Sequence, residues 1–405
     1  MRPPLRDRGG PGPFWPLPYL QHNAVCLDGG ARFESMHNPQ VKKVAQAVSP
    51  APVDIVYLWV DGSDPVWRGK RNAAFAQWNR ENPSNLAAFG NTAGRYRDND
   101  ELLFNLRALE KFFPDHGHVY LVTDGQTPAW LQPSDRLTVI DHRDLFPQST
   151  LSVFDSGHIE SYLHHIASLS ERFIYMNDDV FFGATVDIDW WFGEGLKVFS
   201  ELGSVPNYET FQQDASALVN ASLLSRDWLS QRYPQYEHDP RVYSHAPRAM
   251  LKSAMVELER IASELFTQVR STTFRSWKVP PIVPDLVPRW MVHVGYADQK
   301  TLDPLYISTG DDRAEEQLAT LLNEFGQLPF FCINDTCDEA SEDDIRLTRI
   351  AKTLQQLLPQ PSSFELASTL QWPQPFLAQA LHQPLPATCL PAKRGQPPAA
   401  SAALP

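Results

Sequence analysis

The sequence predicts an α/β fold, built on an open and mostly parallel β-sheet that is flanked by helices. Two observations predict it. Short apolar runs rich in β-branched and aromatic residues alternate along the chain with segments whose apolar residues recur at helical spacing. The runs are also apolar throughout instead of alternating with polar residues, which is typical of strands buried on both faces of a sheet.

Four apolar runs are predicted strands because each is short and ends at polar or turn-forming residues. They lie at residues 53–60, 118–123, 137–141 and 173–176. Helical spacing predicts helices over 100–113, 156–168, 247–266 and 314–323, with an extended proline-rich loop at 279–288. In sheets of this kind, ligands bind beyond the carboxyl ends of the strands.

Acidic residues follow three of the predicted strands, namely Asp61, Asp124 and the Asp178–Asp179 pair. No G-x-G-x-x-G motif follows the first strand, so a dinucleotide site is disfavoured. The pattern indicates a nucleotide-diphospho-sugar pocket on a GT-A, Rossmann-like fold. We expect a catalytic domain over 51–350, a flexible Pro/Gly-rich arm over 1–50, and a disordered Pro/Gln/Ala-rich tail over 359–405.

Composition limits the classes of function and location. The net charge is −13, from 35 Lys+Arg against 48 Asp+Glu, which argues against general nucleic-acid binding. No run approaches the ~20 apolar residues of a membrane-spanning helix, and the N-terminus lacks a signal-peptide core. We expect a cytoplasmic protein, with peripheral association at the inner face of a membrane left open. The four cysteines are expected to be free thiols.

The Asn177-Asp178-Asp179 step is the first candidate site. Adjacent carboxylates repel unless a cation or hydrogen-bond donors offset the repulsion, and Mg²⁺ prefers such oxygens. Metal binding and a plain turn both remain open. Asp335 ends another apolar run and offers a further carboxylate, although by local pattern alone a plain turn is the favoured explanation of that position.

Further candidates flank the strands and helices. Asp61 could accept hydrogen bonds from a ribose or base, and Gly62 would let the backbone approach a ligand, with a capping turn as the alternative. Arg97 could contact a phosphate near a helix N-terminus or form a structural pair with an aspartate. His245 could accept a hydroxyl proton, and the guanidinium forks of Arg248 and Arg275 could hold phosphoryl oxygens.

Taken together, these segments resemble the four conserved regions of the Stealth family. That family includes bacterial capsular polysaccharide phosphotransferases and the catalytic part of the lysosomal-enzyme N-acetylglucosamine-1-phosphotransferase. The resembling segments are 54–65, 95–183, 244–276 and 330–335, in the same order as in the family. The resemblance implies that Asp178, Asp179 and Asp335 hold Mg²⁺ or Mn²⁺ at the donor diphosphate. It also implies that His245, Arg275 and Asp179 are catalytic.

The reaction that the resemblance implies is transfer of a hexose or N-acetylhexosamine 1-phosphate from a UDP-sugar to a hydroxyl of a carbohydrate acceptor. It would release UMP and form a phosphodiester in a capsular or other surface polysaccharide, with Asp61 and Asn177 helping to fix the nucleotide-sugar. Two alternatives remain open. One is a metal-dependent glycosyltransferase of the same fold that releases UDP, and the other is a non-catalytic carbohydrate-binding protein.

Overall fold

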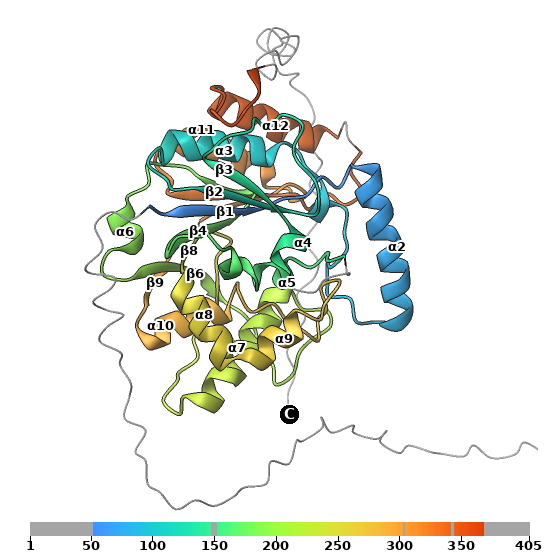
Figure 1. Cartoon of the computed structure of the whole chain (residues 1–405), viewed down its shortest axis with the longest axis vertical. Coiled ribbons are helices and arrows are strands. Elements are labelled where there is room, and N and C mark those ends of the chain that lie inside the picture. The colour runs from blue at the N-terminus through green and yellow to red at the C-terminus, as the bar shows by residue number, and fades with distance from the viewer. Residues whose placement is uncertain (1–51, 147–151, 303, 342–343, 368–405) are drawn as a thin grey trace, which may run out of the picture.

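The computed structural model describes residues 52–146, 152–302, 304–341 and 344–367. Its central sheet has the strand order β3-β2-β1-β4-β8 (Figure 1). The strands are β1 (Asp54–Leu58), β2 (Val119–Thr123), β3 (Leu137–Asp141), β4 (Arg172–Asn177) and β8 (Arg248–Leu251). The first four run parallel and β8 pairs antiparallel with β4 at the edge. The predicted α/β fold with a mostly parallel sheet is therefore confirmed.

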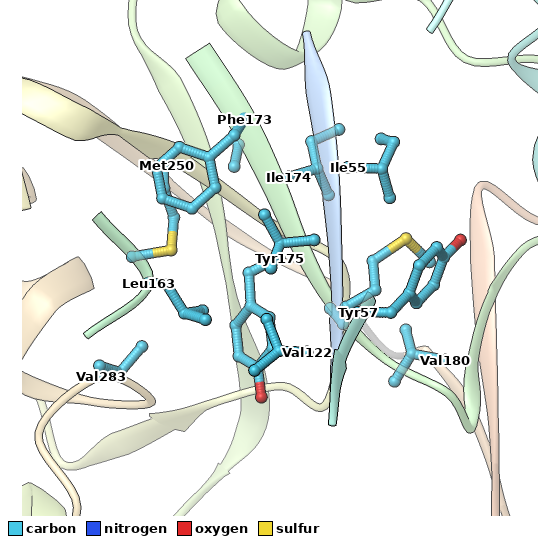
Figure 2. Packing of buried hydrophobic residues seen from close by; sticks show 14 of the residues in the cluster. Ile55, Tyr57, Val122, Leu163, Phe173, Ile174, Tyr175, Val180, Met250 and Val283 are labelled. Carbon is cyan, nitrogen blue, oxygen red and sulfur yellow. The ribbon is translucent and has the colours of Figure 1, made fainter. Parts of the chain in front are cut away.

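The central strands are buried because their side chains are apolar on both faces of the sheet. Ile55, Val56 and Tyr57 of β1 and Phe173 to Met176 of β4 have no exposed surface. Figure 2 shows Leu163 and Val283 beside Tyr175 on one face, and Val180 beside Tyr57 on the other. This two-sided packing explains why these runs lack the polar alternation of a strand with one solvated face.

Two smaller sheets of three strands each accompany the central one. The first has the order β10 (Leu305–Ser308), β11 (Phe330–Asn334), β5 (Val180–Phe182), and the second has the order β7 (Arg241–Tyr243), β6 (Leu196–Ser204), β9 (Ala297–Thr301). Strand β5 follows β4 after the Asp178–Asp179 turn and pairs antiparallel with β11. That pairing brings the end of β11, where Asn334 and Asp335 lie, to the same edge of the molecule.

Helices cover both sides of the central sheet (Figure 1). On one side lie α3 (Glu101–Phe112), α11 (Ala314–Glu324) and α12 (Ile345–Leu357), and on the other α7 (Ala217–Arg232), α8 (Lys252–Ile261), α9 (Ser263–Val269) and α10 (Leu286–Val294). Helix α2 (Pro65–Glu81) stands at one end of the sheet. The shorter helices are α4 (His142–Leu145), α5 (Ser156–Glu160), α6 (Ile188–Phe192) and the 3₁₀ turns η1 (Gly94–Tyr96) and η2 (Leu163–His165).

Three predicted segments differ in the structure. The helix predicted over 247–266 is wrong at its start, because Arg248–Leu251 forms the edge strand β8 through pairing with β4, and the rest is divided at Ala262. The helix predicted over 156–168 is replaced by α5 and η2. The predicted loop at 279–288 gives way to α10 from Leu286 onward.

The chain remains ordered past residue 350. Helix α12 ends at Leu357, and the following segment packs against α3, where Phe364 is fully buried. The guanidinium of Arg107 donates to both oxygens of Glu365, at 2.8 Å from Nε and 2.6 Å from Nη2. The prediction of a disordered tail is therefore wrong for 359–367. Residues 368–405 and the predicted arm lie outside the described residues.

Two further observations concern composition. Cys332 and Cys337 are free, as predicted, and both are buried. Cys26 and Cys389 fall in parts of the chain that the structure does not describe. Among the described helices, none has the length and apolar character needed to cross a membrane.

Candidate active site

A cavity of about 370 Å³ opens at the carboxyl ends of β1, β2 and β4. Its walls include the residues that directly follow these strands, among them Trp59, Asp124 and Asp178. Most of the predicted site residues line it, namely Arg97, Asn177, Asp178, Asp179, His245, Arg248, Arg275 and Asp335. The fold thus gathers residues from segments that are far apart in the sequence around one hollow.

Asp61 and Gly62 are not among the lining residues. The Asp61 carboxylate accepts hydrogen bonds from the Ser63 backbone N–H at 2.8 Å and from the Ser63 hydroxyl at 2.6 Å. The Gly62 N–H donates to the Tyr96 carbonyl oxygen at 2.7 Å. A Cβ atom at position 62 would lie 2.1 Å from that oxygen, so close backbone approach to Tyr96 explains the glycine. Ligand binding by these two residues stays a prediction.

Helix α3 holds the Asp178–Asp179 turn in place. The buried Asn105 side-chain amide donates to the carbonyl oxygens of Asp178, at 3.0 Å, and Val180, at 2.5 Å. The Tyr57 hydroxyl donates to the Asn105 side-chain oxygen at 2.8 Å. Because one of these carbonyl groups lies within the acidic pair and the other directly follows it, the backbone of the pair is fixed between β4 and β5.

Several carboxylates lie close together at this turn. Burial raises the pKa of Asp178 well above its ordinary value, and the negative charges of Asp179, Glu101 and Asp98 add to the rise. Burial likewise raises the pKa of Asp98 to about 7 and that of Glu101 to about 8. A bound divalent cation would offset this repulsion, so the donor set fits a metal ion at the turn.

The immediate neighbours of Asp179 also include metal-ligating groups. Ligand atoms of Asp179, His245 and Cys332 all lie within 4.8 Å of one another. Asp178 and Asp335 line the same cavity but do not join that group among the residues searched, which are those the structure describes. The Asp178, Asp179 and Asp335 metal set therefore stays a prediction.

Asp335 already has protein partners. Its Oδ2 accepts from Arg97 Nη1 at 2.5 Å and from the Asn99 amide at 3.2 Å, and its Oδ1 accepts from the Cys337 backbone N–H at 2.9 Å. Arg97 also donates to the Cys337 and Ala340 carbonyl oxygens. The structural Arg–Asp pair considered as an alternative is thus present, and phosphate binding by Arg97 stays a prediction.

A hydrogen-bonded relay reaches His245 from the buried wall of the cavity. Tyr175 and Asn177 share one face of β4, two residues apart. The Tyr175 hydroxyl lies 3.0 Å from Glu160 Oε1 and 2.6 Å from the Asn177 side-chain oxygen position. The Asn177 amide nitrogen position lies 3.0 Å from His245 Nε2, which is also 3.2 Å from Asp179 Oδ1.

The number of protons available in the relay allows one arrangement of donors and acceptors. A tyrosine hydroxyl has one proton, and ionised Glu160 and Asp179 can only accept. Every contact is satisfied when Tyr175 donates to Glu160, the Asn177 amide group is flipped to donate to Tyr175, and His245 Nε2–H is shared between the Asn177 oxygen and Asp179. His245 Nδ1 makes no hydrogen bond to the described residues and carries no proton in this arrangement, so it is free to accept one.

The lining also has a cationic wall, which includes Arg95 and Arg275. Burial lowers the pKa of Arg275 to about 10, and the positive charge of Arg95 adds to the lowering. The nearest carboxylate oxygen, Asp155 Oδ1, is 3.9 Å from Arg275 Nε. The buried Nε atoms of both arginines and the Trp67 indole N–H have no hydrogen-bond partner. Unpartnered buried donors are costly, so this wall suits an anion.

Sequence reasoning missed Arg95, Trp67, Tyr175 and Glu160. Arg95 stands two residues before Arg97, and a face-sharing test on β4 would have connected Tyr175 with Asn177. Trp67 and Glu160 gave no signal, because their role depends on contacts with distant segments. Arg248 was predicted, and it lies on β8 with its guanidinium 5.9 Å from the centre of the Tyr175 ring.

Comparison with known proteins identifies related sequences. Conserved-region models of the Stealth protein family match residues 51–74 (region 1), 95–198 (region 2) and 327–374 (region 4), which confirms three of the predicted segments. An exopolysaccharide phosphotransferase of Streptomyces coelicolor is 34% identical over 84% of this chain, which spans only 58% of that protein. The capsular polysaccharide phosphotransferase of Actinobacillus suis is 32% identical over 70% of this chain and 76% of that protein.

Among solved structures, the galactosyltransferase LgtC, in complex with donor and acceptor sugar analogues, covers 76% of this chain and 98% of its own. The sequence identity is 9% and the TM-score is 0.35, which is too low to support an argument.

Proposed function

This chain belongs to the Stealth protein family, and we propose that it is a phosphotransferase of capsular or other surface polysaccharide synthesis. The names of its Streptomyces and Actinobacillus relatives support this reaction class. The observation in this chain that carries the proposal is the cavity itself. Its lining combines buried arginine Nε donors that have no hydrogen-bond partner with an excess of buried carboxylates.

We infer that the donor is a UDP-sugar carrying a hexose or N-acetylhexosamine, and that the acceptor is a carbohydrate hydroxyl. A nucleotide diphospho-sugar needs cationic groups for its phosphate oxygens, and the Arg95 and Arg275 guanidinium groups offer them. Arg248 adds a third cation to the lining. The family resemblance supplies the choice of uridine nucleotide.

In the proposed reaction, the acceptor hydroxyl oxygen attacks the phosphorus nearest the sugar. The new bond joins that oxygen to phosphorus, and the bond between this phosphorus and the bridging oxygen breaks, so UMP leaves with both bonding electrons. The sugar C1–O bond is untouched, which retains the anomeric configuration. His245 Nδ1 accepts the hydroxyl proton, while Arg275 and Arg248 hold the phosphoryl oxygens during transfer.

The carboxylates of Asp178 and Asp179, with Asp335 as a further candidate, would hold Mg²⁺ or Mn²⁺. When bound, the ion would supply positive charge that stabilises the diphosphate oxygens and the departing nucleotide. The protein's own part is positioning: Asn105 fixes the turn, and the relay from Glu160 to His245 orients the imidazole. The cytoplasmic location and the lack of a nucleic-acid partner stay predictions.

The deciding experiment identifies the nucleotide that is released. The purified protein is incubated with Mg²⁺, a panel of UDP-sugars and a mixed oligosaccharide acceptor. UMP together with a phosphodiester-linked product supports the proposal. UDP release would assign the chain to the glycosyltransferases instead. If neither nucleotide is released in any acceptor mixture, absence of metal-dependent donor binding would favour a non-catalytic carbohydrate-binding protein.

A further inference from the structure

Outside the cavity, three side chains with metal-ligating atoms converge on one point. His164 and His165 end the 3₁₀ turn η2, and Glu259 lies on α8. His164 Nε2 lies 2.5 Å and His165 Nε2 lies 2.8 Å from the same oxygen, Glu259 Oε2. All three ligand atoms lie within 4.8 Å of one another. Neither the family resemblance nor the proposed reaction uses this cluster.

We propose that His164, His165 and Glu259 form a binding site for a divalent transition-metal ion, with Zn²⁺ as the best fit. Two imidazole nitrogens and one carboxylate oxygen are a usual protein ligand set for zinc, whereas Mg²⁺ and Ca²⁺ prefer oxygen ligands. Tetrahedral ligands about 2.0–2.1 Å from zinc lie about 3.3 Å apart. Each histidine nitrogen therefore needs to move less than about 1 Å away from Glu259 Oε2 to admit the ion.

The surroundings leave the required atoms available. Arg270 donates to Oε1 of Glu259, which orients the carboxylate and leaves Oε2 toward the two histidines. Its guanidinium also stacks 3.8 Å from the centre of the Tyr162 ring. The His164 side chain is 1% exposed, but Glu259 is 24% and His165 35% exposed, so an ion can enter from solvent and keep a water ligand. The positive charge of Arg270 makes the site weaker than an enclosed four-ligand site.

The ion would brace one wall of the cavity. In the segment 156–165, Ser156 and Glu160 line the cavity. The two histidines follow them at the end of the segment. Ser156 accepts a hydrogen bond from Arg275 at 2.7 Å. Metal binding would tie this segment to α8, so we expect it to raise thermal stability. The site does not depend on the reaction proposed above, because none of its three ligands lines the cavity.

Co²⁺ titration of the full chain, first stripped of metal with a chelator, tests the proposal. We expect visible absorption bands of tetrahedral Co²⁺ without thiolate charge transfer, displacement of the bands by Zn²⁺, and a rise in melting temperature. Loss of even an outer-shell partner of a metal site costs about 10- to 100-fold in affinity. His165→Asn and Glu259→Gln should therefore weaken Zn²⁺ binding at least tenfold. His118→Asn, a partly exposed histidine elsewhere, is the matched control and should bind as wild type does.

A Cys332→Ser variant separates this site from the Asp179, His245 and Cys332 group. The bands should persist in that variant and vanish in His165→Asn. Wild-type Zn²⁺ affinity in both His165→Asn and Glu259→Gln would overturn the proposal, as would a wild-type chain that binds Co²⁺ only through Cys332.

Discussion

The side-chain amide of Asn105 on α3 donates a hydrogen bond of 3.0 Å to the backbone carbonyl oxygen of Asp178. Its second donor serves Val180, and its oxygen accepts from Tyr57. One buried amide thus links the helix, the first strand and the acidic turn. The position of the carboxylates depends on a residue that touches no ligand in the proposed reaction.

We expect Asn105→Ala to lower the free energy of unfolding by about 2–3 kcal/mol, because it leaves buried polar groups without partners. Urea unfolding monitored by circular dichroism measures the change. Gln77→Ala, at an exposed position of α2, is the control and should stay within about 0.5 kcal/mol of wild type. A stability loss no larger than that of the control would show that the Asn105 hydrogen bonds do not hold the turn.

His245→Ala should lower kcat by about 100- to 10,000-fold, since the substitution removes the proposed proton acceptor. The unfolding midpoint should change little, because the imidazole is partly exposed at the cavity. The assay is UMP release at saturating donor and acceptor, with matched circular dichroism spectra. Turnover at the wild-type rate would remove His245 from the catalytic set.

Tyr175→Phe should lower kcat more mildly and leave KM nearly unchanged. The lost hydroxyl contributes a hydrogen bond of about 1 kcal/mol to the relay, which corresponds to about fivefold in rate. Tyr243→Phe removes another buried hydroxyl, one that donates to Gln299 and lies outside the relay, and should keep wild-type kcat. Equal kcat in the two variants would contradict a positioning role for Tyr175.

Glu365→Ala should cost about 3–5 kcal/mol of stability, because it leaves the Arg107 charge buried without its partner. The side chains of this pair are 6% and 1% exposed. The double variant Arg107→Met, Glu365→Leu should recover most of the loss, because it removes both charges. Chemical denaturation of wild type, Arg107→Met, Glu365→Leu and the double variant completes a double-mutant cycle that measures the coupling. Additive losses would indicate that the pair contributes no interaction energy.

Stability should fall as the pH drops below about 6.5, in part through His238. Burial and the positive charges of Arg289 and Arg226 lower the pKa of this histidine to about 4. Between pH 4 and the unfolded pKa of about 6.5, the unfolded chain binds a proton that the folded chain does not. The slope that results is at most about 1.4 kcal/mol per pH unit.

His238→Gln should therefore show a shallower decline of unfolding free energy between pH 6.5 and pH 4.5 than wild type. Tyr236→Phe removes a hydrogen-bond partner of His238 while the imidazole remains, and should keep the wild-type slope. Parallel pH profiles for wild type and His238→Gln would show that this histidine does not drive acid unfolding.

The parallel strands could be predicted from sequence because a strand that is buried on both faces has a continuous run of apolar residues. The strand predicted over 137–141 matches β3 at both ends. Helix α2 was not predicted, because Trp67 is its only buried residue and no apolar stripe marks a helix. Arg248–Leu251 was predicted as helix because its local pattern is helical, and only pairing with the edge of β4 makes it a strand.

Some residues of the candidate site could likewise be predicted from local sequence, and others could not. Asp178, Asp179 and Asp335 stand at strand ends, where polar residues after apolar runs are visible locally. The partners that orient the site are not visible locally: Asn105 is one polar residue in an amphipathic helix, and Glu160 is one polar residue inside the helix predicted over 156–168. Their functions arise from strand register and helix packing, which link positions far apart in the chain.

The Arg107–Glu365 ion pair joins positions 258 residues apart. During synthesis on the ribosome, the Arg107 guanidinium on α3 can pair with Glu365 only after almost the whole domain has emerged. Long-range pairings of this kind slow folding and prolong exposure of apolar strands to other nascent chains. Residues 359–367 therefore set the moment at which the domain becomes complete. A chain that lacked them would leave Arg107 without its partner and expose the part of α3 that this segment covers, which would favour proteolysis.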